Sequence, residues 1–154
     1  MNLKRAYEQD FNYWIEQHIA LLREGKLNEI DVEHLLEELE DMGKSNQNEL
    51  ESRFRVLLAH LLKWQFQYQQ LQEQWKTFTG GSWRGSIREQ RKGITKKLKQ
   101  NPSLKRHLAA AVKEAYPDAI DIASDETGLP TATFPHECPY TLEQLLNDNF
   151  FPEE

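Results

Sequence analysis

Apolar residues recur every three or four positions along most of the chain, which is the spacing of one face of an α-helix. The first such stretch runs from about Lys4 to Arg23 and is followed by Gly25, a residue suited to the left-handed conformation just beyond a helix end. No segment alternates apolar and polar residues as a half-buried strand does. The pattern therefore predicts an all-α protein.

The longest periodic stretch runs from Val32 to Gln69 and follows Asp31, a suitable N-cap residue. A straight helix of that length would span roughly 55 Å, which exceeds the size of a compact domain of this length. Gly43 lies within the stretch, and we predict a kink or break near it. The expected apolar stripe consists of Leu35, Leu39, Met42, Leu50, Phe54, Leu57, Leu61, Trp64 and Tyr68.

Two further helices are predicted after a polar connector at residues 70–81. Ser82 is expected to cap the first of them, and Asn101-Pro102 has the residue types that favour the start of the second. Pro117 should kink this second helix because proline has no amide hydrogen, and Gly128 should end it. The connector is expected to be anchored by its two aromatic residues, Trp75 and Phe78.

The last segment, residues 131–154, is interrupted by prolines but is too apolar for a solvated tail. Thr141 and Gln144 have the spacing of a capping box and predict one short helix. We expect the segment to pack across the other helices as a strap. The prediction is therefore a single domain over 1–154, built as a compact helical bundle of about four main helices with a C-terminal strap. Its large apolar residues are Phe134, Tyr140, Leu145, Leu146, Phe150 and Phe151.

Charge is distributed in blocks around a net of −6. Residues 29–51 carry nine acids and one base, residues 84–106 carry nine bases and one acid, and residues 114–154 carry ten acids and neither Lys nor Arg. The basic helix either pairs with its acidic neighbours or presents a face to an external anionic partner, nucleic acid included. Its bases are Arg84, Arg88, Arg91, Lys92, Lys96, Lys97, Lys99, Lys105 and Arg106.

Composition limits where the protein acts. The single cysteine, Cys138, cannot form an intramolecular disulfide, which fits a reducing cytoplasm. No apolar run approaches the roughly 20 residues that span a bilayer, and no secretory signal is evident at the N-terminus, so we expect a cytoplasmic protein with no membrane partner. Cys138 itself is expected to be a small buried residue, because its neighbour Glu137 disfavours a thiolate.

Five polar residues fall on or beside the apolar stripes. An isolated buried charge costs several kcal/mol, so we expect these residues to meet in one network. The network either fixes the register of the helices or forms a polar pocket in which a carboxylate beside a histidine is a general base and arginines bind an anion. No clear nucleophile accompanies them. The five are Glu38, Arg53, His60, Arg91 and Glu126.

Motifs for metals and cofactors are weak or missing. His34 and Glu38 are four residues apart and would share a helix face, but two ligands on one helix are weak evidence for a metal. Gly80-Gly81 has neither the following lysine nor the preceding strand of a phosphate-binding loop. We therefore expect no cofactor and no metal.

Several groups of residues occur along the chain in an order that is specific as a combination. The most specific are Glu37-Glu38-Leu39-Glu40 with Met42-Gly43, His60-Leu61-Leu62-Lys63-Trp64, Asn101-Pro102-Ser103-Leu104 and Glu126-Thr127-Gly128-Leu129. In this order the sequence resembles the bacterial domain-of-unknown-function family numbered twenty-nine over about residues 7–151. The resemblance implies an all-helical domain and no particular activity.

The functional expectation is correspondingly broad. The pattern favours a small cytoplasmic binding or regulatory module with a protein partner. An enzyme that uses the Glu/His/Arg residues and a nucleic-acid-binding protein that uses the basic third helix are the alternatives.

Overall fold

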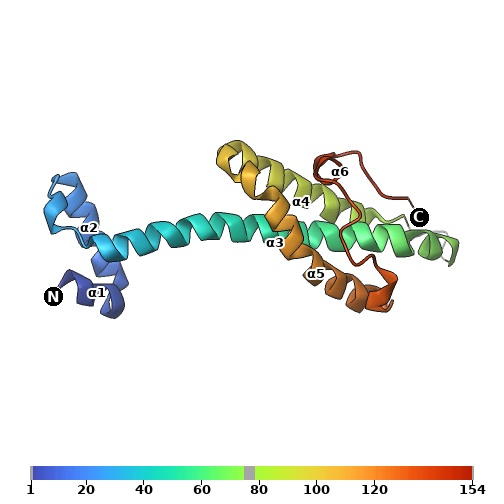
Figure 1. Ribbon diagram of the computed structural model, residues 1–154, viewed down its shortest axis with the longest axis horizontal. Coiled ribbons are helices and arrows are strands. Elements are labelled where there is room, and N and C mark those ends of the chain that lie inside the picture. Colours follow the sequence, from blue (N-terminus) through green and yellow to red (C-terminus); the bar gives the residue numbers. More distant parts are fainter. Residues whose placement is uncertain (1, 75–78, 154) are drawn as a thin grey trace. The chain divides into compact units, whose positions relative to one another are not determined.

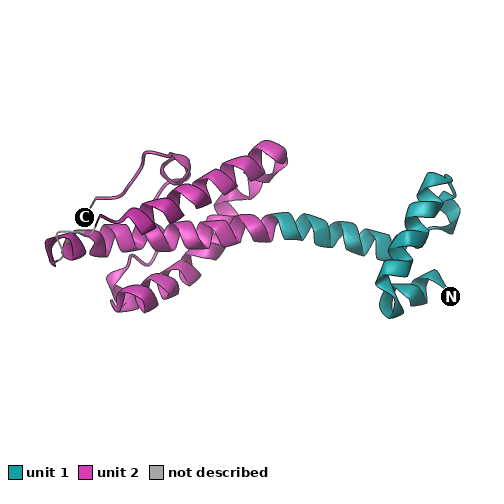
Figure 2. Cartoon of the chain, turned by 180° about the vertical axis from the view of Figure 1, so that it is seen from behind, with its two compact units in different colours: residues 1–46 teal, residues 47–154 magenta. Residues whose placement is uncertain are grey.

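The computed structural model describes residues 2–74 and 79–153, so the predicted anchors Trp75 and Phe78 lie outside the described residues. All regular secondary structure in these two ranges is helical, which confirms the all-α prediction (Figure 1). The chain forms two compact units, an N-terminal unit of residues 1–46 and a C-terminal unit of residues 47–154 (Figure 2). That residues 1–154 act as a single domain stays a prediction.

The N-terminal unit begins with two helices where the periodicity predicted one. Helix α1 spans Leu3–Gln9 and α2 spans Phe11–Arg23. Between them Asp10 leaves the helical conformation, and its carboxylate accepts a hydrogen bond of 3.1 Å from the backbone N–H of Tyr13. The continuous helix is thus a wrong prediction, because an aspartate that caps a new helix competes with its place inside the old one. Gly25 adopts the expected left-handed conformation, with φ of 70°.

A short 3-10 turn over Leu27–Glu29 leads into α3, which spans Val32–Gln74. Helical structure continues through Gly43, so the predicted break is absent. A single glycine costs a helix only about 1 kcal/mol relative to alanine, and a Cβ at Gly43 would meet no neighbouring atom. The residue around which we predicted a break is therefore tolerated within one helix.

The C-terminal unit has a large apolar core made by the second part of α3, helices α4 and α5, and the last segment. Helix α4 spans Gly81–Gln100 and α5 spans Leu108–Thr127, with a 3-10 helix over Pro102–His107 between them. Most of the second part of the predicted stripe is confirmed as buried, whereas Tyr68 is only partly buried against this core. The residues that α3 contributes to the core are Leu50, Phe54, Leu57, Leu58, Ala59, Leu61, Leu62 and Trp64.

Glycines in the left-handed conformation flank the start of α4 and the end of α5. Gly80 precedes α4 with φ of 68°, so it takes the cap position that we predicted for Ser82. The helix predicted to begin at Pro102 begins as 3-10 and becomes α-helical only at Leu108. Pro117 lies inside α5, and Gly128 ends that helix with φ of 75°.

The last segment contacts the helices of the C-terminal unit through both apolar and polar groups. The segment begins with a 3-10 turn over Thr131–Thr133, and Thr141 and Gln144 form the predicted capping box of α6, which spans Leu142–Leu146. The Tyr116 hydroxyl donates to the carbonyl of Pro135 at 2.6 Å. Three side chains of the last segment are buried in the core: Phe134, Tyr140 and Leu145.

Among the helices in the described ranges, none combines the length and the apolar character that crossing a membrane requires.

Candidate functional site

The five polar residues predicted to meet each contact a different group. Glu38 accepts from the Tyr7 hydroxyl in the N-terminal unit, whereas the other four belong to the C-terminal unit. Arg53 donates to the side-chain oxygen of Gln90 at 3.2 Å and pairs with Glu49 at 3.5 Å. No hydrogen bond or ion pair within the described residues joins two members of the set, so the structure gives no evidence of one network.

The remaining members differ in burial as well as in partners. His60 bonds through Nδ1 to the carbonyl of Val56 at 2.9 Å, and its burial lowers the pKa of its ring. Glu126 accepts from Lys63 at 2.8 Å with its side chain 48% exposed, so it is not core-facing as predicted. Its carboxylate nevertheless lies near enough to His60 to favour the protonated ring, although burial outweighs that effect.

Arg91 is the one member of the set that is fully buried. Its Nε donates to the carbonyl of Leu145 at 2.9 Å and its Nη2 to that of Gln144 at 3.2 Å. These carbonyls belong to the end of α6, and that of Gln144 also accepts the backbone N–H of Asn147 at 3.3 Å. Burial lowers the pKa of the guanidinium, and the charge of Asp148 opposes that shift. Arg91 therefore holds the last segment on α4, which is a structural role.

The basic stretch is mostly exposed rather than paired. In the described part of the chain, the base of this stretch that forms an ion pair with an acid is Lys97, which pairs with Glu49. This contact is the main reason that the pKa of Glu49 is lowered. The expectation of general pairing with acidic neighbours is therefore met at one position. Four exposed bases recur every three or four residues of α4: Arg88, Lys92, Lys96 and Lys99.

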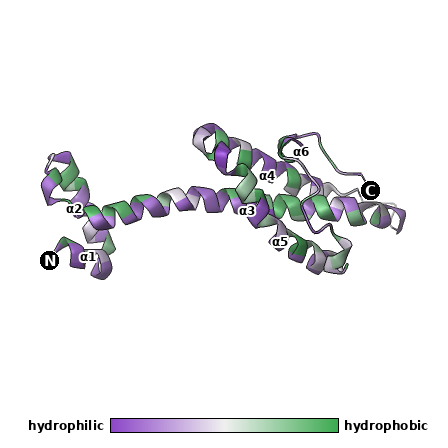
Figure 3. Ribbon diagram, in the orientation of Figure 1, coloured by the Kyte–Doolittle hydropathy of each residue, from purple (hydrophilic) through white to green (hydrophobic). Residues whose placement is uncertain are grey.

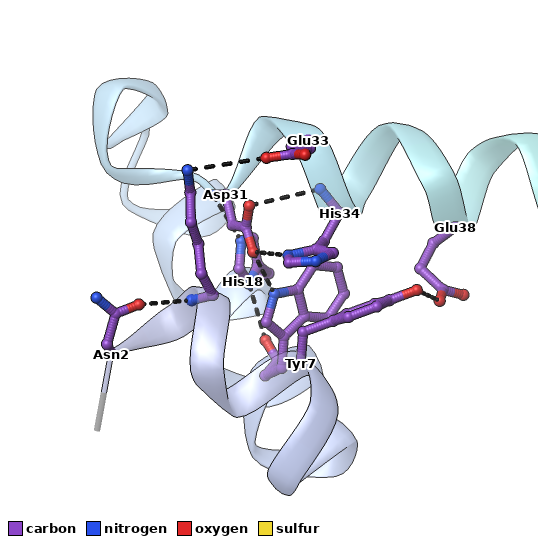
Figure 4. Close-up of polar contacts among 9 residues, drawn as sticks. Asn2, Tyr7, His18, Asp31, Glu33, His34 and Glu38 are labelled. Atoms are coloured by element: carbon purple, nitrogen blue, oxygen red, sulfur yellow. Dashed lines mark hydrogen bonds and ion pairs between the residues drawn. The ribbon is translucent and has the colours of Figure 1, made fainter.

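Asp31 is the centre of a polar cluster in the N-terminal unit that the sequence did not reveal (Figure 4). Its carboxylate accepts from the indole N–H of Trp14 at 3.2 Å and contacts the His34 ring at 2.6 Å. Burial raises the pKa of this carboxyl, but the hydrogen bonds from His34 and Trp14 outweigh burial and leave it below its ordinary value. A buried aspartate thus joins α2 to the first turn of α3.

His18 closes this cluster in a defined tautomer. Its Nε2 accepts the backbone N–H of Asp31 at 2.9 Å, so that nitrogen carries no hydrogen. Its Nδ1 therefore carries the hydrogen and donates to the carbonyl of Trp14, also at 2.9 Å. The neutral ring satisfies one group on α2 and one on the segment before α3, and it lies against the Trp14 indole with 4.1 Å between ring centres.

The weak metal pair has other partners. His34 bonds to Asp31 and stacks on Tyr7 with ring centres 4.0 Å apart, and the hydrogen bond to Asp31 raises its pKa. Glu38 accepts from Tyr7, which raises the pKa of that phenol. Within the described residues, no group of three or more histidine, cysteine or acidic side chains is arranged to hold a metal. Cys138 is half-buried, and burial raises its thiol pKa.

Large apolar side chains are exposed in the N-terminal unit. We predicted Leu39 and Met42 on a buried stripe, yet they are 56% and 64% exposed, which corrects the first part of that prediction. Among residues 2–46, the buried apolar residues of this unit are Ala6 and Trp14. Figure 3 shows apolar positions interspersed with polar ones along α2 and the first turns of α3. The exposed residues are Phe11, Ile19, Leu22, Leu27, Val32, Leu36, Leu39 and Met42.

Net charge is also distributed unequally between the two units. Residues 1–46 contain eleven acids and five bases and so carry the whole net charge of −6. Residues 47–154 contain fourteen of each and are neutral overall. The sequence alone contains this signal, but it becomes visible only when the boundary between the units is known.

Taken together, the fold and this surface define a class of small all-helical protein with a well-packed C-terminal unit and an acidic N-terminal unit that exposes apolar side chains. The chain belongs to the family described as domain of unknown function DUF29, whose sequence pattern matches residues 6–151 and confirms the resemblance. No curated protein and no solved structure is significantly similar to the chain.

Proposed function

We propose that the protein is a binding module that recognises a protein partner through its N-terminal unit and acts in the cytoplasm, where its single thiol stays reduced. The observation that carries the proposal is the contrast between eight exposed large apolar side chains and two buried apolar residues in the same unit. Clustered exposed apolar residues of this kind mark interaction sites in soluble proteins.

The exposed apolar residues set the scale of such an interaction. Full burial of one large apolar side chain from complete exposure contributes roughly 1.5–3 kcal/mol. The four that the first turns of α3 present are 55–66% exposed, so covering them would supply on the order of 4–7 kcal/mol. Association itself costs about 4–15 kcal/mol, so binding requires that the partner also cover the exposed apolar residues of α2.

The test is capture of partners from cells that express the protein natively, with the wild type and with the double variant Leu36→Ser, Leu39→Ser as bait. Both leucines are more than half exposed, so the variant should keep the helical content and melting temperature of the wild type. We expect a protein retained by the wild type to be lost with the variant. Retention of every partner by the variant would contradict the proposal.

A second candidate function is binding of nucleic acid by α4, which the exposed bases Arg88, Lys92, Lys96 and Lys99 favour. Fluorescence anisotropy with a 20-nucleotide RNA or DNA at 50 and 200 mM salt tests it. Specific use of this face requires binding that weakens steeply with salt and is reduced by Arg88→Ala, Lys92→Ala. The same variant is the matched control for the capture experiment, because it changes exposed residues of the other unit.

Catalysis by Glu38, Arg53, His60, Arg91 and Glu126 stays a prediction, and the separate contacts of these residues give it no support.

A further inference from the structure

We infer that the partner segment is a basic amphipathic helix that lies along the first turns of α3. The inference rests on the proposed function and specifies the chemistry of its partner. It follows from the spacing of the exposed apolar residues and from the acidic residues that border them.

The spacing selects a helix. Val32, Leu36, Leu39 and Met42 are separated by four, three and three residues and are each more than half exposed. Residues at these intervals form one continuous stripe along a helix, which is the seam that a second amphipathic helix covers. The hydrogen bond from the Trp14 indole to Asp31 fixes the first turn of α3 to α2, so this end of the stripe is already ordered before a partner binds.

The flanking charges select a basic partner. Glu33 lies three residues before Leu36 and Glu40 four residues after it, so both border the stripe. Of these two acids, Glu40 is exposed and forms no ion pair in the described part of the chain. Glu33 does form an ion pair, with Lys4 at 3.8 Å, but both side chains are largely exposed. A partner with lysine or arginine beside its apolar stripe would supply the missing counter-charges.

A second copy of this chain fits the surface poorly. Symmetric pairing of two N-terminal units would place acidic flanks against acidic flanks, and like charges brought together at an interface are costly. The basic helix α4 of another copy has the right charge, but its apolar residues Ile87, Ile94 and Leu98 are buried in its own core. The net charge of −6 on residues 1–46 also repels nucleic acid and anionic lipid from this unit.

The experiment is selection from a displayed library of 18-residue peptides. All members share leucine at helical seam positions, and the positions on both flanks are randomised among Lys, Glu, Ser and Ala. The bait is the full chain, and each selected peptide is then measured by fluorescence anisotropy. We expect lysine to be enriched at the flanking positions, and we expect selected peptides to bind about tenfold tighter than the same seam with glutamate flanks.

Three variants separate the contributions. Glu33→Gln, Glu40→Gln keeps the stripe and should abolish the enrichment of lysine. Leu36→Ser, Leu39→Ser keeps the charge and should abolish binding. Glu143→Gln removes an exposed acid of the C-terminal unit and should change neither result. Circular dichroism of each variant checks that the helical content is unchanged.

The outcomes are distinguishable. Binding that requires Leu36 and Leu39 with no preference for lysine overturns the basic partner but keeps the proposed function. Binding that survives the loss of both leucines overturns both. Failure to select any peptide overturns the helical partner, and a dimer in light scattering that dissociates in the Leu36→Ser, Leu39→Ser variant would replace it with a second copy of the chain.

Discussion

The Asp31 carboxylate shows how one buried acid is made tolerable. It accepts from an indole and from an imidazole, and its own backbone N–H donates to a second imidazole. A buried carboxylate without such donors would cost several kcal/mol. Here the donors stabilise the charged form, and the same contact favours the protonated form of His34.

The stability of the N-terminal unit should therefore depend on pH at both ends of a window. The raised pKa of His34 contributes stability that is complete below its ordinary value of 6.5 and is lost as pH rises through the folded value. The lowered pKa of Asp31 contributes stability that is present above 3.8 and is lost as pH falls through its folded value. NMR titration of the His34 ring should thus give a pKa above 6.5.

Asp31→Asn should lower the pKa of His34, because it removes the charge that favours the protonated ring. The control is Asp41→Asn, which changes an exposed acid of α3, the helix that carries His34. It should leave the pKa of His34 unchanged. Identical titration curves in the wild type and Asp31→Asn would show that the contact is not made.

Arg91 gives a second prediction at this scale. Replacement by alanine removes two donors and leaves the carbonyls of Gln144 and Leu145 without them, so it should reduce the free energy of unfolding by about 2–4 kcal/mol. Arg88→Ala, at an exposed position of the same helix, should change it by less than about 0.5 kcal/mol. Urea titrations compare the two, and equal small losses would contradict the structural role.

At the scale of elements, the start of α4 depends on a glycine for two reasons. Gly80 has φ of 68°, and a Cβ there would lie 2.7 Å from the Tyr68 ring and 3.0 Å from the Trp64 ring. Gly128 at the end of α5 has φ of 75° but has free space around it. Gly128→Ala should therefore cost about 1–2 kcal/mol from backbone strain alone.

Gly80→Ala should cost about 1–3 kcal/mol more, because aromatic rings of the core must move as well. Thermal or urea unfolding of the two variants measures the difference. A cost for Gly80→Ala no greater than that of Gly128→Ala would show that the rings move freely.

The elements that could be predicted are those whose signals are local. The Thr141 capping box and the stop at Gly128 depend on neighbouring residues, and both appear as expected. The break at Asp10 was missed because its apolar neighbours keep helical spacing across it. The continuity of α3 through Gly43 was missed because the expectation rested on the assumption that the helix must fit inside one compact body.

The candidate site was predicted less well, for a physical reason. Position on an apolar stripe shows which way a Cβ points, whereas long side chains such as those of Glu126 and Arg53 extend to partners at the edge. The Asp31 cluster joins residues up to 17 apart through turns whose geometry the sequence does not specify. Its one visible hint was His18, which lies four residues after Trp14 on the same helix face.

For the whole molecule, the unequal cores predict unequal stability. A fragment of residues 47–154 contains nearly all of the buried apolar side chains and should retain helical circular dichroism and a cooperative thermal transition. Among its described residues, a fragment of residues 1–46 has Ala6 and Trp14 as its buried apolar residues, and it should be largely unfolded alone. A cooperative transition in the short fragment would contradict this expectation.

The small interior of the N-terminal unit also makes its amide protons a gauge of occupancy. With two buried apolar side chains, little free energy protects the backbone of residues 3–42 from hydrogen exchange. A ligand at 100 times its Kd adds about 2.7 kcal/mol to the cost of opening, which slows exchange about a hundredfold. Exchange in the C-terminal unit, already limited by its core, would scarcely change, so the ratio of the two rates reports how much of the protein is bound.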